Sequence, residues 1–169
     1  MKQIHYIVLI VVCIFNSKLN AQNVTQEKTL SWNTELMKAN ELSNETNKPI
    51  FAFFTGSDWC GWCKKLQRDV YSKPAFIEWA AENVILLELD FPKNTKLNPE
   101  ITAQNSRLQQ SFKVQGYPTI WLFTMKKDET TENFVINQLG SCGYPSGFEE
   151  GKQEVKFIND CNAILLNNK

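Results

Sequence analysis

The sequence has no excess of either charge and no basic run. Its 169 residues include 18 lysines and arginines and 18 aspartates and glutamates, so the formal net charge is zero. Proteins that bind nucleic acids gather positive charge on one face or segment to meet the phosphates, so we expect no nucleic-acid partner. Internal repeats and low-complexity tracts are also lacking. The composition is that of an ordinary globular protein with its own core.

Long hydrophobic runs are scarce as well. The most apolar run, residues 4–15, is too short to cross a bilayer comfortably. It follows Lys2 and precedes the small residue Ala21, a pattern typical of a secretory signal peptide cleaved after Ala21. We therefore expect residues 1–21 to be removed and the domain 22–169 to be secreted or periplasmic. A retained N-terminal anchor is the alternative.

Histidine is nearly absent. The only one, His5, lies in the expected signal peptide together with Cys13. Their removal would leave no imidazole, which excludes Ser-His or Cys-His nucleophilic catalysis and any metal site that contains histidine. Four of the five cysteines would remain, in an exported protein where disulfides can persist. Thiol chemistry is therefore the leading candidate.

Two of these cysteines, Cys60 and Cys63, are three residues apart and directly follow an apolar run. If Cys60 begins a helix, Cys63 lies one turn further on and the two sulfurs come within bonding distance. The partial positive charge at the helix start would favour a thiolate on Cys60, which makes Cys60 the attacking thiol and Cys63 the resolving thiol. The alternatives are a static disulfide and half of a zinc site. Structural zinc takes four ligands and no second close pair is present, so we expect no metal.

The apolar pattern predicts strands that alternate with helices. Residues 50–54, 84–89 and 119–123 are unbroken or nearly unbroken apolar runs, typical of strands buried on both faces. A short polar turn joins the third of these to a strand at residues 133–139, which predicts an antiparallel hairpin. Helices are expected at residues 34–46 with Asn33 as N-cap, 60–71, 74–82, 99–112 and 148–167, with a loop over 140–147. The expected fold class is α/β, with a central mixed sheet flanked by helices.

Two motifs in this order resemble the thioredoxin superfamily. They are WCGWC at residues 59–63, after a buried strand, and GYPT at residues 116–119, before a later strand. The stretch 54–64 is closer to exported bacterial thioredoxin-like proteins of the disulfide-isomerase-related type than to cytosolic thioredoxin. The resemblance covers residues 30–167 and implies a thioredoxin fold and thiol:disulfide exchange with protein substrates. It also implies no metal or organic cofactor, and a redox partner, soluble or membrane-bound, that recharges the dithiol.

The resemblance assigns roles to four residues. Cys60 would be the exposed nucleophile and Cys63 the resolving thiol. Pro118 would be the cis-proline that faces the pair. In the family, the residue before this proline offers backbone hydrogen bonds to the bound polypeptide, and here that residue is Tyr117.

Two positions depart from the thioredoxin pattern. The buried acid below the dithiol is replaced by Phe53 or Phe54, so the proton relay of thioredoxin is not carried over, and Trp62 stands where thioredoxin has proline. Trp62 is expected to point outward, either to contact substrate or to shield the dithiol, whereas Trp59 is expected in ordinary packing. Asp58 is expected to be a solvated loop acid, with a role in proton transfer as the alternative.

The remaining cysteines, Cys142 and Cys161, have two interpretations. They form a structural disulfide between the loop and the last helix, which would contribute about 3 kcal/mol through loop entropy, or Cys161 is a buried free thiol. The sequence also leaves open whether the protein oxidises, reduces or isomerises its substrates. A second hypothesis from another class is a binding module that uses the thioredoxin fold to hold a partner, with a purely structural disulfide. The reduction potential distinguishes the two, because catalysts lie between about −270 and −120 mV and structural disulfides below about −300 mV.

Overall fold

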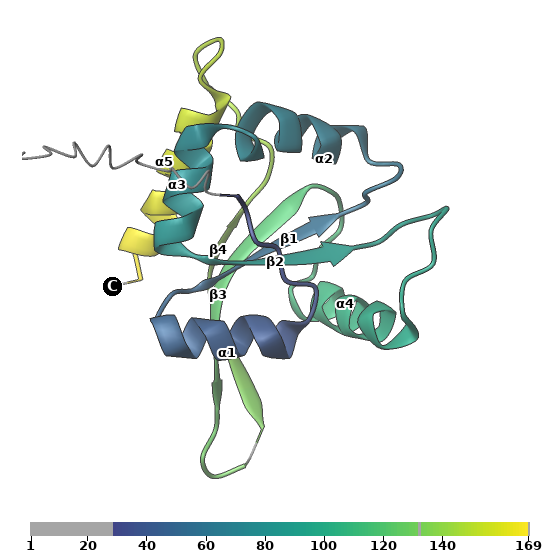
Figure 1. Ribbon diagram of the computed structural model, residues 1–169. Helices are drawn as coiled ribbons and strands as arrows, with labels where there is room; N and C mark the ends of the chain where they lie inside the picture. The colour runs from purple at the N-terminus through teal and green to yellow at the C-terminus, as the bar shows by residue number, and fades with distance from the viewer. Residues whose placement is uncertain (1–28, 132, 169) are drawn as a thin grey trace, which may run out of the picture.

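The computed structural model describes residues 29–131 and 133–168. The expected signal peptide, residues 1–21, lies outside these residues. Within them, no helix combines the length and the apolar character that crossing a bilayer requires. Strands and helices alternate along the first part of the chain, and a hairpin and a helix close it, as the apolar pattern predicts (Figure 1).

A mixed sheet of four strands lies at the centre, in the order β2-β1-β3-β4. The strands β1 (Ile50–Thr55) and β2 (Ile85–Asp90) run parallel. Antiparallel to β1 is β3 (Thr119–Lys127), which forms a hairpin with β4 (Phe134–Cys142). The expected α/β fold with a mixed sheet and a C-terminal antiparallel hairpin is therefore confirmed.

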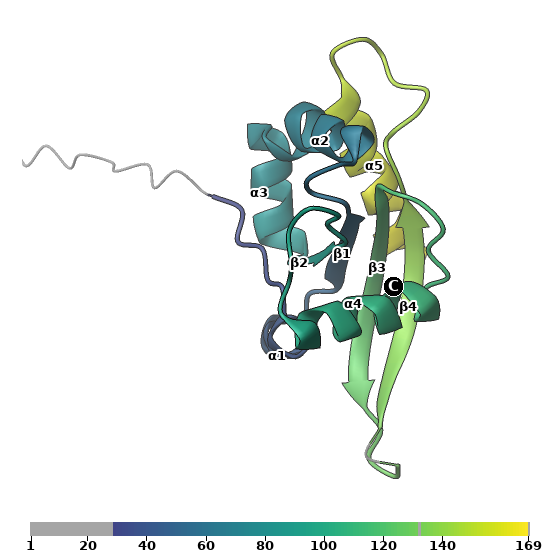
Figure 2. The same cartoon turned by 90° about the vertical axis from the view of Figure 1, so that its right-hand side faces the viewer.

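Helices cover both faces of the sheet. One face carries α2 (Gly61–Leu66), its π-helical continuation η1 (Gln67–Tyr71), α3 (Pro74–Asn83) and α5 (Gln153–Leu166), and the other carries α1 (Leu36–Thr46) and α4 (Pro99–Ser111). Figures 1 and 2 show α2, α3 and α5 in the upper part of the view and α1 and α4 in the lower part. Two separate apolar cores result, one on each side of the sheet.

The central strand β1 supplies both cores. All six of its residues are buried. Successive side chains of a strand point to opposite faces, so Phe51 and Phe53 join the core that contains the two motif cysteines, whereas Phe54 joins the core below the sheet. The C-terminal end of this buried strand leads directly to the turn before α2. In open α/β sheets this end of the strands is where sites collect.

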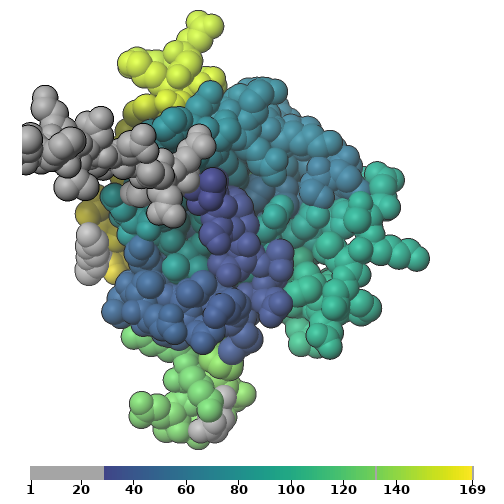
Figure 3. Space-filling model, viewed as in Figure 1, coloured from purple at the N-terminus to yellow at the C-terminus, as the bar shows by residue number. Residues whose placement is uncertain are grey.

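Several boundaries differ from the prediction, and β3 continues to Lys127, four residues past its expected end. Asn33 is not the N-cap of α1, because Glu35 holds that position and Asn33 forms a β-bridge with Leu87. β4 continues through Cys142, so residues 140–142 belong to a strand and not to the expected loop. α5 begins at Gln153, five residues later than expected. The later start of α5 lengthens the loop before it. Figure 3 shows this loop projecting at one end of the molecule and the β3–β4 hairpin at the other.

Candidate active site

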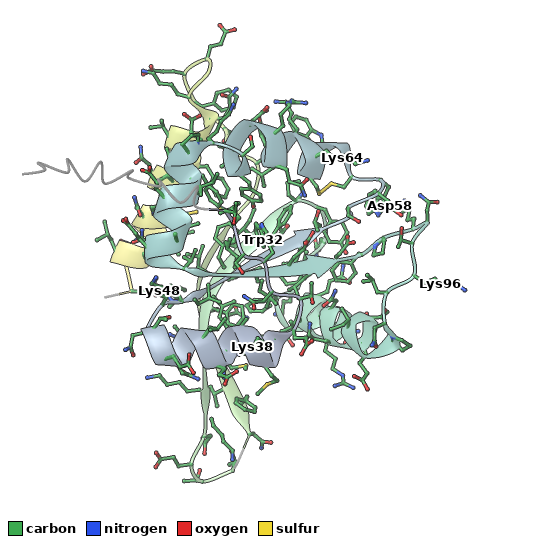
Figure 4. The ribbon with its side chains drawn as sticks, viewed as in Figure 1. Trp32, Lys38, Lys48, Asp58, Lys64 and Lys96 are labelled. Carbon is green, nitrogen blue, oxygen red and sulfur yellow. A yellow bond between two sulfur atoms is a disulfide. The ribbon has the colours of Figure 1, made fainter. Side chains whose placement is uncertain are left out.

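The two motif cysteines form a disulfide at the start of α2. The two sulfurs are 2.09 Å apart and the two Cα atoms 5.3 Å apart. Cys60 has extended backbone angles and is the N-cap of the helix, and the backbone N–H of Cys63 donates to its sulfur at 3.1 Å. Figure 4 shows the S–S bond at this end of α2, near Lys64 and Asp58. The expected helix start and pairing are thus both present.

The two cysteines differ slightly in their access to solvent. Cys60 is 5% exposed, and Cys63 is 0% exposed and lies among the core residues of its face. A group that approaches from outside therefore meets Cys60 before Cys63. Cys60 is less exposed than the sequence-based expectation of an exposed nucleophile.

The turn before the helix is fixed by Trp59. Its indole ring lies over Gly56, where an added Cβ would be 2.5 Å from the ring. Its Nε1–H donates to the carbonyl oxygen of Phe91 at 2.8 Å, and its ring meets that of Tyr117 edge-on at 5.7 Å. The Lys93 ammonium sits 4.0 Å from the ring centroid, within the range of a cation–π contact. Trp59 is therefore packed as expected, although 39% of its surface is exposed.

Asp58 connects the same turn to the loop after β2. Its carboxylate accepts backbone N–H groups of Lys93 at 3.0 Å and Asn94 at 2.6 Å. These hydrogen bonds, that of Lys93 first, hold the pKa of Asp58 below its usual value. Asp90 makes a second connection, because it accepts from the backbone N–H and the hydroxyl of Ser57. Asp58 thus holds the loop after β2 against the turn before α2, a role that the sequence did not indicate.

The second motif lies beside the first. The Tyr117–Pro118 peptide bond is cis and directly precedes β3. The Tyr117 ring stacks on Phe91 with centroids 5.3 Å apart, and its hydroxyl accepts from the Gln109 side-chain amide at 2.7 Å. Tyr117 also packs against the core that contains the dithiol. Its ring is therefore held on several sides, while its backbone leads to Pro118.

Trp62, between the two cysteines, is 58% exposed. It meets the ring of Tyr144 edge-on at 5.2 Å. Lys65 donates to the Tyr144 hydroxyl at 2.7 Å, and this hydroxyl donates to the Asp69 carboxylate at 2.8 Å. The hydrogen bond to Tyr144 is the first cause of the raised pKa of Lys65. Tyr144 was missed by sequence reasoning, because it lies 79 residues beyond Lys65 and carries no local motif.

Phe53 packs in the same core as Cys60 and Cys63, whereas Phe54 packs in the core on the other face of the sheet. Phe53 is therefore the residue on the dithiol side of β1. Its direct partner on β2 is Glu88, so an acid lies one strand away from the place where thioredoxin has one. Burial, and to a smaller extent the negative charge of Asp90, raise the pKa of Glu88. Nothing in the local sequence around Glu88 pointed to this placement.

The other two cysteines among the described residues, Cys142 and Cys161, are free thiols. Cys142 is half-buried at the end of β4, and Cys161 is fully buried in α5. Both pack in the core that contains the dithiol. Among residues 29–131 and 133–168, no three His, Cys, Asp or Glu side chains are grouped so that they could hold a metal ion.

The fold agrees with comparisons to known proteins. The family profile of the Thioredoxin-like domain matches residues 36–135. The disulfide bond reductase DsbH of Chlamydia pneumoniae is 32% identical over 113 residues, which are 64% of this chain and 68% of DsbH. A solved structure of a DsbH oxidoreductase superposes with a TM-score of 0.66 at 27% identity and covers 87% of this chain and 93% of its own.

A second relative matches a larger share of this chain but a smaller share of its own length. The thioredoxin-related protein DsbJ of Chlamydia pneumoniae is 25% identical over 151 residues, which are 89% of this chain and 42% of DsbJ. The chain therefore spans less than half the length of that relative.

Proposed function

The chain belongs to the thioredoxin-like family, and on that premise we propose that it is an exported thiol:disulfide oxidoreductase that acts on protein substrates through Cys60 and Cys63. The observation that carries the proposal is the Cys60–Cys63 disulfide at the N-cap of α2, in which Cys60 is 5% exposed and Cys63 is fully buried. Export is supported by the signal-peptide pattern of residues 1–21.

The reaction proceeds by two exchanges at sulfur. In the reducing direction, the Cys60 thiolate attacks a substrate disulfide, a mixed disulfide forms, and one substrate thiolate leaves. Cys63 then attacks the Cys60 sulfur, which releases the second substrate thiol and restores the internal disulfide. The N–H of Cys63, which donates to the Cys60 sulfur at 3.1 Å, stabilises negative charge on that sulfur. No metal or organic cofactor takes part in these steps.

Trp62, Tyr117 and Pro118 form the proposed substrate-binding surface. Trp62 is the most exposed aromatic side chain of the motif and stands between Cys60 and Cys63 in the sequence. Tyr117 has its ring fixed by Phe91 and Gln109, which leaves its backbone for an extended polypeptide to pair with. A rigid backbone edge beside an exposed indole suits substrates of varied sequence, since main-chain hydrogen bonds do not depend on side chains.

We infer the reducing direction, and a redox partner that returns electrons to the dithiol. DsbH, 32% identical over 113 residues, is named a disulfide bond reductase. A reductase of this kind should have a potential near that of thioredoxin, about −270 mV. Equilibration with glutathione or dithiothreitol buffers would measure it, and a value near −120 mV would instead indicate an oxidase.

Single substitutions test the mechanism. Cys60→Ala should reduce turnover in an insulin-reduction assay to the background rate, because the accessible sulfur is lost. Cys63→Ala should accumulate mixed disulfides between Cys60 and substrate proteins, because the resolving sulfur is lost. Thermal unfolding of both variants controls for misfolding, and an active Cys60→Ala protein would refute the mechanism.

One observation favours the alternative of a binding module. Cys60 is only 5% exposed while the disulfide is closed, and a structural disulfide in such a position would resist reduction. A reduction potential below about −300 mV would support this alternative. A potential in the catalytic range, together with trapped mixed disulfides, would exclude it.

A further inference from the structure

The two free thiols lie where β4 meets α5. Cys142 is the last residue of β4 and Cys161 lies on the buried side of α5. Close by, an added Cβ on Gly140 would come within 2.8 Å of the Ile164 side chain, so the two elements approach closely at this point. Cys142 lies two residues from Gly140 in β4, Cys161 lies three residues from Ile164 in α5, and both cysteines pack in the same core. The two thiols therefore meet between β4 and α5 although nineteen positions separate them in the chain.

The pair has the same asymmetry as the dithiol of the motif. Cys142 is half-buried and Cys161 is 0% exposed. Tyr71 lies in the same core, and its buried hydroxyl has no hydrogen-bond partner among residues 29–131 and 133–168. The neighbouring Cys142 side chain first, and then burial, raise the pKa of the Cys161 thiol well above its usual value. A half-buried thiol thus adjoins a fully buried one.

Cys142 is also joined to the candidate active site. In the register of the hairpin it pairs with Ile120, two residues after Pro118. The next residue, Gly143, lies against the Pro118 carbonyl oxygen, which an added Cβ would approach to 3.4 Å. The residue after that, Tyr144, contacts Trp62 and Lys65. The segment 142–144 therefore forms one wall of the site, and α5 stands behind it.

We propose that Cys142 and Cys161 are a second thiol–disulfide site, which closes reversibly and ties this wall to α5. Cys142 attacks one sulfur of a small-molecule disulfide, of which oxidised glutathione is the probe, and one thiolate leaves and takes up the proton that Cys142 lost. Cys161 then loses its proton to solvent or buffer and attacks the Cys142 sulfur, and the second thiolate leaves and is protonated. Two protein thiols become one disulfide while one small-molecule disulfide becomes two thiols.

The test uses the full chain with Cys13→Ala, Cys60→Ala and Cys63→Ala, which leaves Cys142 and Cys161 as its two thiols. Its result therefore does not depend on the proposed function. After incubation with oxidised glutathione, both remaining thiols should resist alkylation in denaturant, and the mass should fall by two hydrogens. Dithiothreitol added to the folded protein should restore both thiols. The closed site should raise the melting temperature by about 5–10 °C, because the bond restrains the unfolded chain.

Two further variants in the same background separate the steps. Cys161→Ala should retain one glutathione on Cys142, because nothing displaces it, and Cys142→Ser should leave the melting temperature unchanged by oxidant. Should Cys161→Ala fail to fold, the mass of the parent variant still decides the question. Full alkylation of both thiols after oxidation overturns the proposal. A bond that dithiothreitol cannot open in the folded protein overturns it too, because the cross-link would then be permanent.

Discussion

At the scale of single residues, Gly56 controls the position of Trp59. Gly56→Ala would place a methyl group 2.5 Å from the indole, which must shift and lose its hydrogen bond to Phe91. We expect a loss of about 1–3 kcal/mol in the free energy of unfolding, measured by urea denaturation. Gly116→Ala is the matched control, because its added Cβ meets no atom within 4 Å. Equal stability of the two variants would contradict this account of the turn.

Glu88 makes the stability depend on pH. Burial first, and then Asp90, raise its pKa in the folded state, so the folded protein binds the proton more tightly than the unfolded chain. The stability from this group is therefore present below its unfolded pKa of about 4.5 and lost as pH rises through the folded value. Glu88→Gln should unfold at higher denaturant concentration than wild type at pH 7, with a smaller gain at pH 4. Glu78→Gln, at an exposed site on α3, should show no such difference.

At the scale of elements, hydrogen bonds of Asp58 connect the turn before α2 to the loop after β2. Its carboxylate binds the backbone at Lys93 and Asn94, so the loop after β2 is held against the turn before α2. Asp58→Ala should free that loop and accelerate tryptic cleavage after Lys93 and Lys96, followed by mass spectrometry. Asp128→Ala, which removes a carboxylate from the distant β3–β4 turn, is the control and should leave these cleavages unchanged. Unchanged cleavage in Asp58→Ala would show that other contacts hold the loop.

The elements that could be predicted from the sequence are those whose signal is local. An apolar run followed by Cys60 and Cys63 specifies a buried strand, a turn and a helix start within a dozen residues, and all three are present. The end of β4 could not be predicted in this way. Gly140 has a weak strand preference, and residues 140–142 are held in a strand by pairing with β3.

At the scale of the whole molecule, the candidate site combines parts that are far apart in the chain. The pairing of Cys60 with Cys63 could be predicted because three residues separate them. The contacts of Tyr144 with Trp62 and Lys65 could not, since they depend on how the loop before α5 returns over α2. The sequence suggested a contact between Cys142 and Cys161 only as one of two alternatives. The place of Cys142 in the wall of the site depends on the register of the hairpin.

The β-bridge between Asn33 and Leu87 affects whether two copies of the protein can associate through the edge of the sheet. The outer rim of a sheet offers unused N–H and C=O groups on which a foreign chain can aggregate. On β2, Asn33 already binds the Leu86 carbonyl oxygen and the Glu88 N–H, so polymerisation through the middle of this rim is blocked. The opposite rim is less protected, because the outer strand β4 exposes the apolar side chains of Phe134 and Val135.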